Sequence, residues 1–293
     1  MKQRIYAGAG GIKLIADVAG NADAPAVILL HGGGQTRHSW SGVMRALVRA
    51  GYHVINVDAR GHGESDWSVD GAYSIQARAL DLLEILQHVN GPVALVGASM
   101  GGATALYASC AQTEHQIVAR VLVDIVPNPA ASGIQRIKEF MHAHLDGFDS
   151  VEAAIAAVVA YNPERVRSPD PQGIRKNLRE TSTGRLHWHW DPKVLTLDAE
   201  EESAALLEVI KLVPSNRLKN TLLVRGLNSD VVLDENVEAF RNLLPDLEVF
   251  DVEGASHMVA GDKNDVFNAG IISYLQRQLP IVAAPIKTQQ RIY

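Results

Sequence analysis

Short apolar runs alternate with amphipathic segments along most of the chain. The runs are AVILL (26–30), HVINV (53–57), VALV (93–96), RVLVDI (120–125), TLLV (221–224) and LEVFDV (247–252). Most of them are rich in Val, Ile and Leu without polar alternation, as in strands that are buried on both faces of a parallel sheet. Residues 74–89 carry apolar side chains at three- and four-residue spacing, which predicts a helix with one apolar stripe. The alternation therefore predicts an α/β fold, a mostly parallel sheet with helices on both faces.

Three segments depart from this alternation. RIY (4–6) and KLIA (13–16) flank a glycine-rich turn, which predicts an antiparallel hairpin at one edge of the sheet. Residues 129–215 are rich in alanine, arginine and acidic residues, and they show helical periodicity in SVEAAIAAVV (150–159). We interpret them as a helical cap over one end of a core that comprises residues 1–128 and 216–279. Residues 280–293 show neither helical nor strand periodicity, which predicts a loosely attached tail.

Composition narrows the class of protein. With 293 residues, 47% hydrophobic content and 20% charged residues, the chain is of ordinary globular type and long enough to bury a large core. The net charge of −6 and the scattered Lys and Arg argue against a nucleic-acid partner. No window approaches the roughly 18 apolar residues of a membrane span, and no apolar signal segment follows Met1. We expect a cytoplasmic protein without a membrane partner. The sequence leaves open whether the protein forms a homo-oligomer.

One serine stands where a buried strand is predicted to turn into a helix. Gly97, Ser99 and Gly101 form G-x-S-x-G within GASMGG (97–102), after VALV and before the helix-like ATALYA (103–108). Such a junction holds a nucleophile on a tight, strained turn with its hydroxyl exposed. Glycines are needed beside it because the backbones approach closely and a β-carbon would collide. Ser99 is therefore the predicted nucleophile.

A hydroxyl that attacks a carbonyl also needs hydrogen-bond donors for the oxygen that becomes charged. HGGG (31–34) directly follows the first core run, and its glycines allow backbone N–H groups to approach a bound oxygen. We expect the amides of Gly33 and Met100 to form the oxyanion hole, although the sequence does not decide which of the three glycines donates. His31 is expected to brace this loop from beneath.

The base should lie on a loop just past the carboxyl end of a strand, where open α/β sheets collect their reactive groups. His257, in GASH (254–257), has this position after the run 247–252. The carboxylate that orients it should lie between Ser99 and His257 in the chain, and Asp230 in RGLNSDVV (225–232) is the first choice. Asp124, at the end of the preceding strand, competes with it, and Asp234 is a weaker third candidate. No histidine pair is completed into a ligand set, so no metal is expected.

As a set, these motifs resemble the α/β-hydrolase superfamily. HGGG, DARGHGES (58–65), GASMGG, GLNSD (226–230) and GASHM (254–258) occur in its order and at about its spacing, over residues 1 to about 279. The resemblance implies an eight-stranded, mostly parallel sheet with a helical cap after the sixth strand, a triad of Ser99, Asp230 and His257, and no cofactor. It also implies that Asp58 and Arg60 belong to a structural network.

The resemblance narrows the substrate only partly. A serine at position 99 differs from the aspartate nucleophile of haloalkane dehalogenases and epoxide hydrolases. The chain looks closest to small carboxylesterases, lactonases and perhydrolase-like members. We expect a serine hydrolase that cleaves a small ester or lactone through an acyl-enzyme. The alternatives are a carbon–carbon bond hydrolase of a ring-fission-type diketone, although Gln35, Thr36 and Arg37 replace the usual Pro-Gly after HGGG, and a binding protein without turnover.

Three tryptophans are candidates for the walls of the substrate pocket. Trp188 and Trp190 alternate with histidines in HWHW (187–190), so one side of an extended stretch would present two indoles, and Trp40 follows the oxyanion loop. Packing between cap and core is an equally good interpretation of all three.

Overall fold

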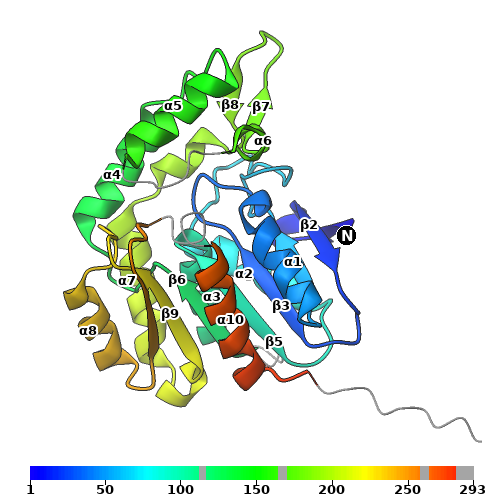
Figure 1. Ribbon diagram of the computed structural model, residues 1–293, viewed down its shortest axis with the longest axis vertical. Helices are drawn as coiled ribbons and strands as arrows, with labels where there is room; N and C mark the ends of the chain where they lie inside the picture. Colours follow the sequence, from blue (N-terminus) through cyan, green and yellow to red (C-terminus); the bar gives the residue numbers. More distant parts are fainter. Residues whose placement is uncertain (112–116, 164–169, 258–263, 282–293) are drawn as a thin grey trace, which may run out of the picture.

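The computed structural model describes residues 1–111, 117–163, 170–257 and 264–281, which form a single eight-stranded sheet with helices on both faces (Figure 1). In chain order the strands are β1 (Lys2–Ala7), β2 (Lys13–Ala19), β3 (Ala26–Leu30), β4 (His53–Val57), β5 (Val93–Ala98), β6 (Ile117–Val123), β9 (Thr221–Gly226) and β10 (Glu248–Val252). Across the sheet their order is β1-β2-β4-β3-β5-β6-β9-β10. Each apolar run of the sequence contains or overlaps one of these strands.

Strand β2 alone among them runs against its neighbours, since it pairs antiparallel with both β1 and β4 while the remaining pairs are parallel. The edge hairpin β1–β2 and the mostly parallel sheet are therefore confirmed. At the centre, all five residues of β3 are buried. The parallel register pairs Leu30 with Gly97, so HGGG and GASMGG leave adjacent strands at the same edge of the sheet.

The helices cover the sheet in two layers. Helices α1 (Ser41–Arg49) and α10 (Asn264–Gln278) lie on one face, where Leu47, Val54 and Ile271 belong to one buried cluster. Helices α2 (Ile75–Leu86), α3 (Met100–Cys110) and α8 (Asp234–Leu243) cover the other face. The predicted helix at 74–89 is thus confirmed as α2. In the part of the chain that the structure describes, no helix is long and apolar enough to cross a membrane.

The segment between β6 and β9, called the insertion below (129–215), lies over the carboxyl edge of the sheet (Figure 1). It contains α4 (Ala131–His142), α5 (Val151–Tyr161), α6 (Pro171–Arg175), β7 (Leu178–Glu180), β8 (Leu186–Trp188) and α7 (Ala199–Leu212). Helices make up most of this segment, as expected, and β7 and β8 add a small antiparallel sheet. The insertion has its own apolar cluster, which includes Phe148, Leu178 and Trp188. The limits of the insertion, 129 and 215, stay a prediction. The predicted tail at 280–293 lies outside the described residues from 282 onward.

Candidate active site

Ser99 occupies a strained turn between β5 and α3, with φ of 46° and ψ of −118°. The flanking glycines are required by close contacts: a β-carbon on Gly97 would lie 2.4 Å from the carbonyl oxygen of Gly101, and one on Gly101 would lie 2.4 Å from that of Leu30. The amide of Ser99 donates to the carbonyl of Val123 at 2.9 Å, which fastens the turn to β6. The surrounding structure thus holds the serine in a conformation that side-chain-bearing residues rarely adopt.

Hydrogen bonds within the HGGG loop single out one of its glycine amides. The amide of Gly32 donates to Gln35 Oε1 at 3.2 Å, and that of Gly34 donates to His62 Nε2 at 3.3 Å. The amides of Gly33 and Met100 have no acceptor among the described residues. A β-carbon on Gly33 would lie 4.0 Å from that of Met100. The two donors expected from the sequence therefore lie close together with their N–H groups unused.

Two buried histidines support this loop from below. The imidazole of His31 bonds the carbonyl of Gly32 through Nδ1 at 2.8 Å and accepts from the amide of Ala59 through Nε2 at 3.0 Å, as expected of a bracing residue. His62 bonds the carbonyl of Arg60 through Nδ1 at 3.1 Å while its Nε2 accepts from Gly34. Burial lowers the pKa of both rings, that of His62 to about 3. Both rings are therefore neutral at pH 7, each with one nitrogen donating and the other accepting.

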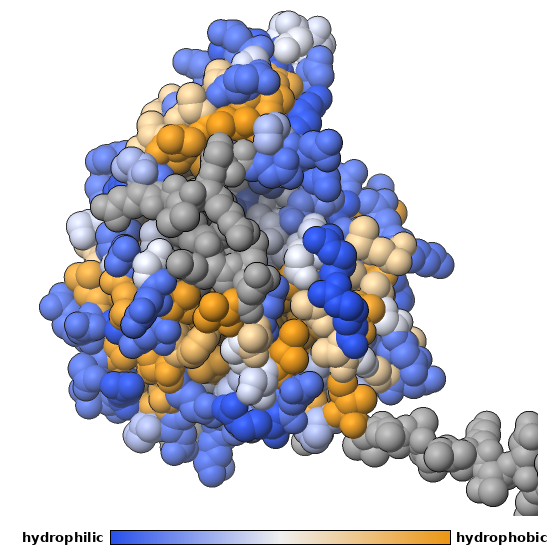
Figure 2. All heavy atoms as spheres, viewed as in Figure 1, coloured by the Kyte–Doolittle hydropathy of each residue, from blue (hydrophilic) through white to orange (hydrophobic). Residues whose placement is uncertain are grey.

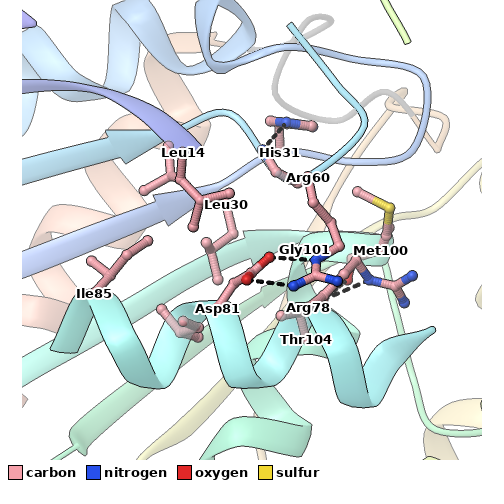
Figure 3. A pocket seen from close by; sticks show the side chains of 13 residues that line it. Leu14, Leu30, His31, Arg60, Arg78, Asp81, Ile85, Met100, Gly101 and Thr104 are labelled. Carbon is pink, nitrogen blue, oxygen red and sulfur yellow. Dashed lines mark hydrogen bonds and ion pairs between the residues drawn. The ribbon is translucent and has the colours of Figure 1, made fainter. Parts of the chain in front are cut away.

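The loop DARGHGES (58–65) forms a buried ionic network beside these histidines. Asp58 is fully buried and pairs with the guanidinium of Arg37, and Arg60 forms two hydrogen bonds of 2.6 Å with Asp81. Figure 3 shows that the Arg60–Asp81 pair borders a small cavity beneath His31. Its volume of about 30 Å³ suits a water molecule and no substrate. The network is thus structural, in agreement with the resemblance.

His257 is hydrogen-bonded to Asp124, whose Oδ2 lies 2.7 Å from His257 Nδ1. Asp124 follows β6 and has a left-handed φ of 48°. It is fully buried, and it also accepts from the amide of Gly226 at 3.1 Å and from the hydroxyl of Ser229. With Nδ1–H directed at the carboxylate, the lone pair of Nε2 is left to act as a base.

The expectation that Asp230 orients His257 was wrong. Its carboxylate is partly exposed and accepts from Arg136 of α4 at 2.7 Å. Because β6 and β9 are neighbours in the sheet, loops carrying Asp124 and Asp230 reach the same edge, and strand position alone does not tell them apart. Asp234, the third candidate, is 93% exposed and pairs with Arg225.

A large cavity of about 1050 Å³ lies between the insertion and the core. Ser99, Gly33 and His257 all contribute to its lining. Between Ser99 and His257 the described residues form no hydrogen bond; unliganded sites often leave this contact open. The geometry brings together a strained serine, a histidine oriented by a buried carboxylate, and two unused amides.

The three tryptophans lie in the wall of this cavity, and each is also buried in packing. Trp40 stacks on Phe267 with the ring centroids 6.0 Å apart, and Trp188 lies edge-on to Phe148 at 5.1 Å. The same three side chains therefore both line the cavity and pack against their neighbours.

Sequence reasoning missed three supporting residues. The side chain of Gln35 accepts a hydrogen bond from the amide of Gly32. The position of Gln35 directly after HGGG could have suggested this local contact. Nothing in the sequence indicates the hydrogen bond that His62 accepts from the amide of Gly34, 28 residues earlier. Ser229 left no signal, because its partner Asp124 is 105 residues away in the chain.

Comparison with known proteins agrees with this geometry. The model of the alpha/beta hydrolase family matches residues 27–269. The chain is 30% identical over 273 residues to the esterase Rv0045c of Mycobacterium tuberculosis, which covers 89% of this chain and 84% of the esterase. It is 32% identical over 280 residues to the sn-1-specific diacylglycerol lipase ABHD11 of Mus musculus, covering 87% and 82% respectively.

Among solved structures, E-2-(acetamidomethylene)succinate hydrolase superposes with a TM-score of 0.79, covering 94% of this chain and 99% of that one. At 21% identity this likeness concerns the fold alone. The Mycobacterium tuberculosis esterase superposes with a TM-score of 0.72 at 27% identity, covering 94% and 92%. The family match and the sequence relatives lead to one conclusion: the chain belongs to the alpha/beta hydrolase family.

Proposed function

We propose that the protein is a serine hydrolase that cleaves a carboxylic ester or lactone through an acyl-enzyme. The observation that carries the proposal is the hydrogen bond of His257 to the buried Asp124, at the wall of the cavity onto which Ser99 opens. The names of the two sequence relatives, an esterase and a diacylglycerol lipase, support an ester as substrate. The cytoplasmic location and a homo-oligomer stay predictions.

In this mechanism His257 Nε2 takes the proton from Ser99 Oγ as the oxygen attacks the ester carbonyl. Asp124 accepts the Nδ1–H bond throughout, so it holds the reactive tautomer and stabilises the imidazolium that forms. Burial of Asp124 strengthens this interaction because little water screens it.

The oxygen of the tetrahedral intermediate is held by the amides of Gly33 and Met100. Met100 is the first residue of α3, so its N–H is one of those that a helix leaves unpaired, and the helix dipole adds to its attraction for negative charge. His257 then protonates the departing alcohol, and the same imidazole activates the water that releases the acyl group from Ser99.

Mass spectrometry of the intact protein after exposure to a fluorophosphonate tests the proposal, together with turnover of p-nitrophenyl acetate. We expect one adduct on the wild-type protein, and the loss of both adduct and turnover in Ser99→Ala. A folded wild-type protein that forms no adduct would contradict an activated serine and favour a binding protein. An adduct without turnover of any ester, together with cleavage of a dienoate diketone, would favour carbon–carbon bond hydrolysis.

A further inference from the structure

The cavity that contains Ser99 is far larger than a small ester requires. Its volume of about 1050 Å³ lies at the upper end of the range of roughly 300–1,000 Å³ found for ligand pockets. A short acyl group would leave most of this space to water. The size of the cavity therefore carries information about the substrate.

Much of the wall of this cavity is apolar and comes from three elements. Helix α4 contributes Ile134, Ile137 and Met141, which lie on one side of the helix at three- and four-residue spacing. At 1.5 Å per residue this stripe is about 10 Å long. Helix α7 adds Leu206 and Leu207, and the segment after β6 adds Ile125 and Val126, which directly follow Asp124. Figure 2 shows hydrophobic residues along the side of the insertion that faces the core.

The arginine and the lysine in the wall are engaged by the protein itself. Arg78 is buried and pairs with Glu202 at 2.6 Å, while its Nε donates to the hydroxyl of Thr104. Lys138 donates to the carbonyl of Leu197 at 3.0 Å. These cations are already bonded, so they do not specify an acidic or strongly polar substrate tail. The wall instead favours burial of an apolar one.

From these observations we propose that the substrate is an ester carrying a long, unbranched aliphatic chain, which lies along the α4 stripe (Ile134, Ile137 and Met141) and against α7. The proposal rests on the proposed ester hydrolysis and specifies its substrate class. The chain belongs either to the acyl group or to the alcohol, and both sources present the same methylene chemistry to the stripe.

Two series of esters, each assayed below the concentration at which it forms micelles, test the proposal. One series is p-nitrophenyl esters of straight-chain acids from C2 to C12, and the other is acetates of straight-chain alcohols over the same range. In the series that places its chain on the stripe, kcat/KM should rise about fourfold per added methylene up to at least C8. The other series should be flat.

Two variants at Ile137 should shift the preferred chain length of the ester in opposite directions. Ile137→Trp shortens the groove, so the ratio of kcat/KM for the C10 ester to kcat/KM for the acetate should fall at least tenfold. Ile137→Ala lengthens the groove and should shift the optimum to longer chains, which keeps the test decisive even where the Trp variant does not fold. His142→Trp is the matched control, because His142 is exposed on α4 outside the cavity wall.

The outcomes separate the two levels of the proposal. Turnover that depends on Ser99 but is highest at C2 or C4 in both series would overturn the long-chain substrate and leave ester hydrolysis intact. The absence of turnover throughout, with no fluorophosphonate adduct, would overturn ester hydrolysis itself. Equal effects of Ile137→Trp and His142→Trp on the C10 ester would also overturn the position of the chain on α4.

Discussion

Two carboxylates, Asp124 and Asp230, follow neighbouring parallel strands and reach the same edge of the sheet, yet their environments differ. Asp124 is fully buried and accepts from His257, Ser229 and the amide of Gly226. Asp230 is partly exposed and pairs with Arg136 of the insertion. The first carboxylate faces the interior of the site, whereas the second fastens a surface helix to the core.

The difference teaches that a position after a parallel strand does not by itself identify the carboxylate that bonds His257. A buried carboxylate with three donors keeps its direction, because each hydrogen bond restricts the side chain. A solvated ion pair gains little free energy and holds its partners loosely. Substitutions at Asp124, Asp230 and Ser229 test this contrast.

The largest expected effect comes from exchanging each carboxylate for an amide. Asp124→Asn should lower kcat by about 10⁴-fold, because an amide holds the wrong tautomer of His257 and does not stabilise the imidazolium. Asp230→Asn should change kcat/KM by less than about threefold. Steady-state assays of both variants, with circular dichroism to confirm folding, measure the contrast. The reverse order of effects would restore Asp230 as the orienting acid.

Low pH should destabilise the folded protein through the buried side chain of His62. Burial holds its pKa at about 3 in the folded protein, against about 6.5 in the unfolded chain. The unfolded chain therefore binds the extra proton, and the free energy of unfolding should fall by about 1.4 kcal/mol per pH unit from this group as pH drops from 6 towards 3. Protonation also removes the acceptor of the Gly34 amide.

Urea unfolding between pH 7 and pH 4 checks this contribution. His62→Gln retains an acceptor and should show a shallower decline with falling pH than the wild type. His88→Gln, at an exposed position, serves as the control and should follow the wild-type slope. A wild-type slope in His62→Gln would contradict the assignment.

A smaller effect is expected at Ser229, which lies on the same loop as Asp230 but donates to Asp124. Ser229→Ala should lower kcat/KM about tenfold, since a hydrogen bond to a charged group contributes about 1.5–3 kcal/mol. Ser229→Thr keeps the hydroxyl and should recover the wild-type kcat/KM. A loss of activity in Ser229→Ala that Ser229→Thr does not recover would contradict a role for this hydrogen bond.

The smallest effect is expected on the free energy of unfolding when the Asp230–Arg136 pair is removed. Both side chains are at least a third exposed, so Asp230→Asn should lower the free energy of unfolding by less than about 1 kcal/mol, and less still in 1 M salt. Arg241→Gln breaks the exposed pair with Glu238 in α8 and is the matched control. A cost in Asp230→Asn several times that of the control would show that this contact does more than fasten the surface.

Much of the fold and part of the site could be predicted because they depend on short stretches of chain. The strands were recognisable from unbroken apolar runs, and Ser99 from two glycines that the tight turn requires. The HGGG loop was recognisable in the same way, but that the amide of Gly33 is left without an acceptor among the described residues depends on the side chains of Gln35 and His62, which accept from Gly32 and Gly34.

Sequence alone therefore indicated the α/β sheet, the strained turn at Ser99 and the loops that carry HGGG and His257, because steric and hydrophobic constraints act there over a few residues. The tertiary structure decided that Asp124 rather than Asp230 bonds His257, and that the cavity has a long apolar wall. Both depend on side-chain directions in segments far apart in the chain, which meet only when the strands and the insertion pack together.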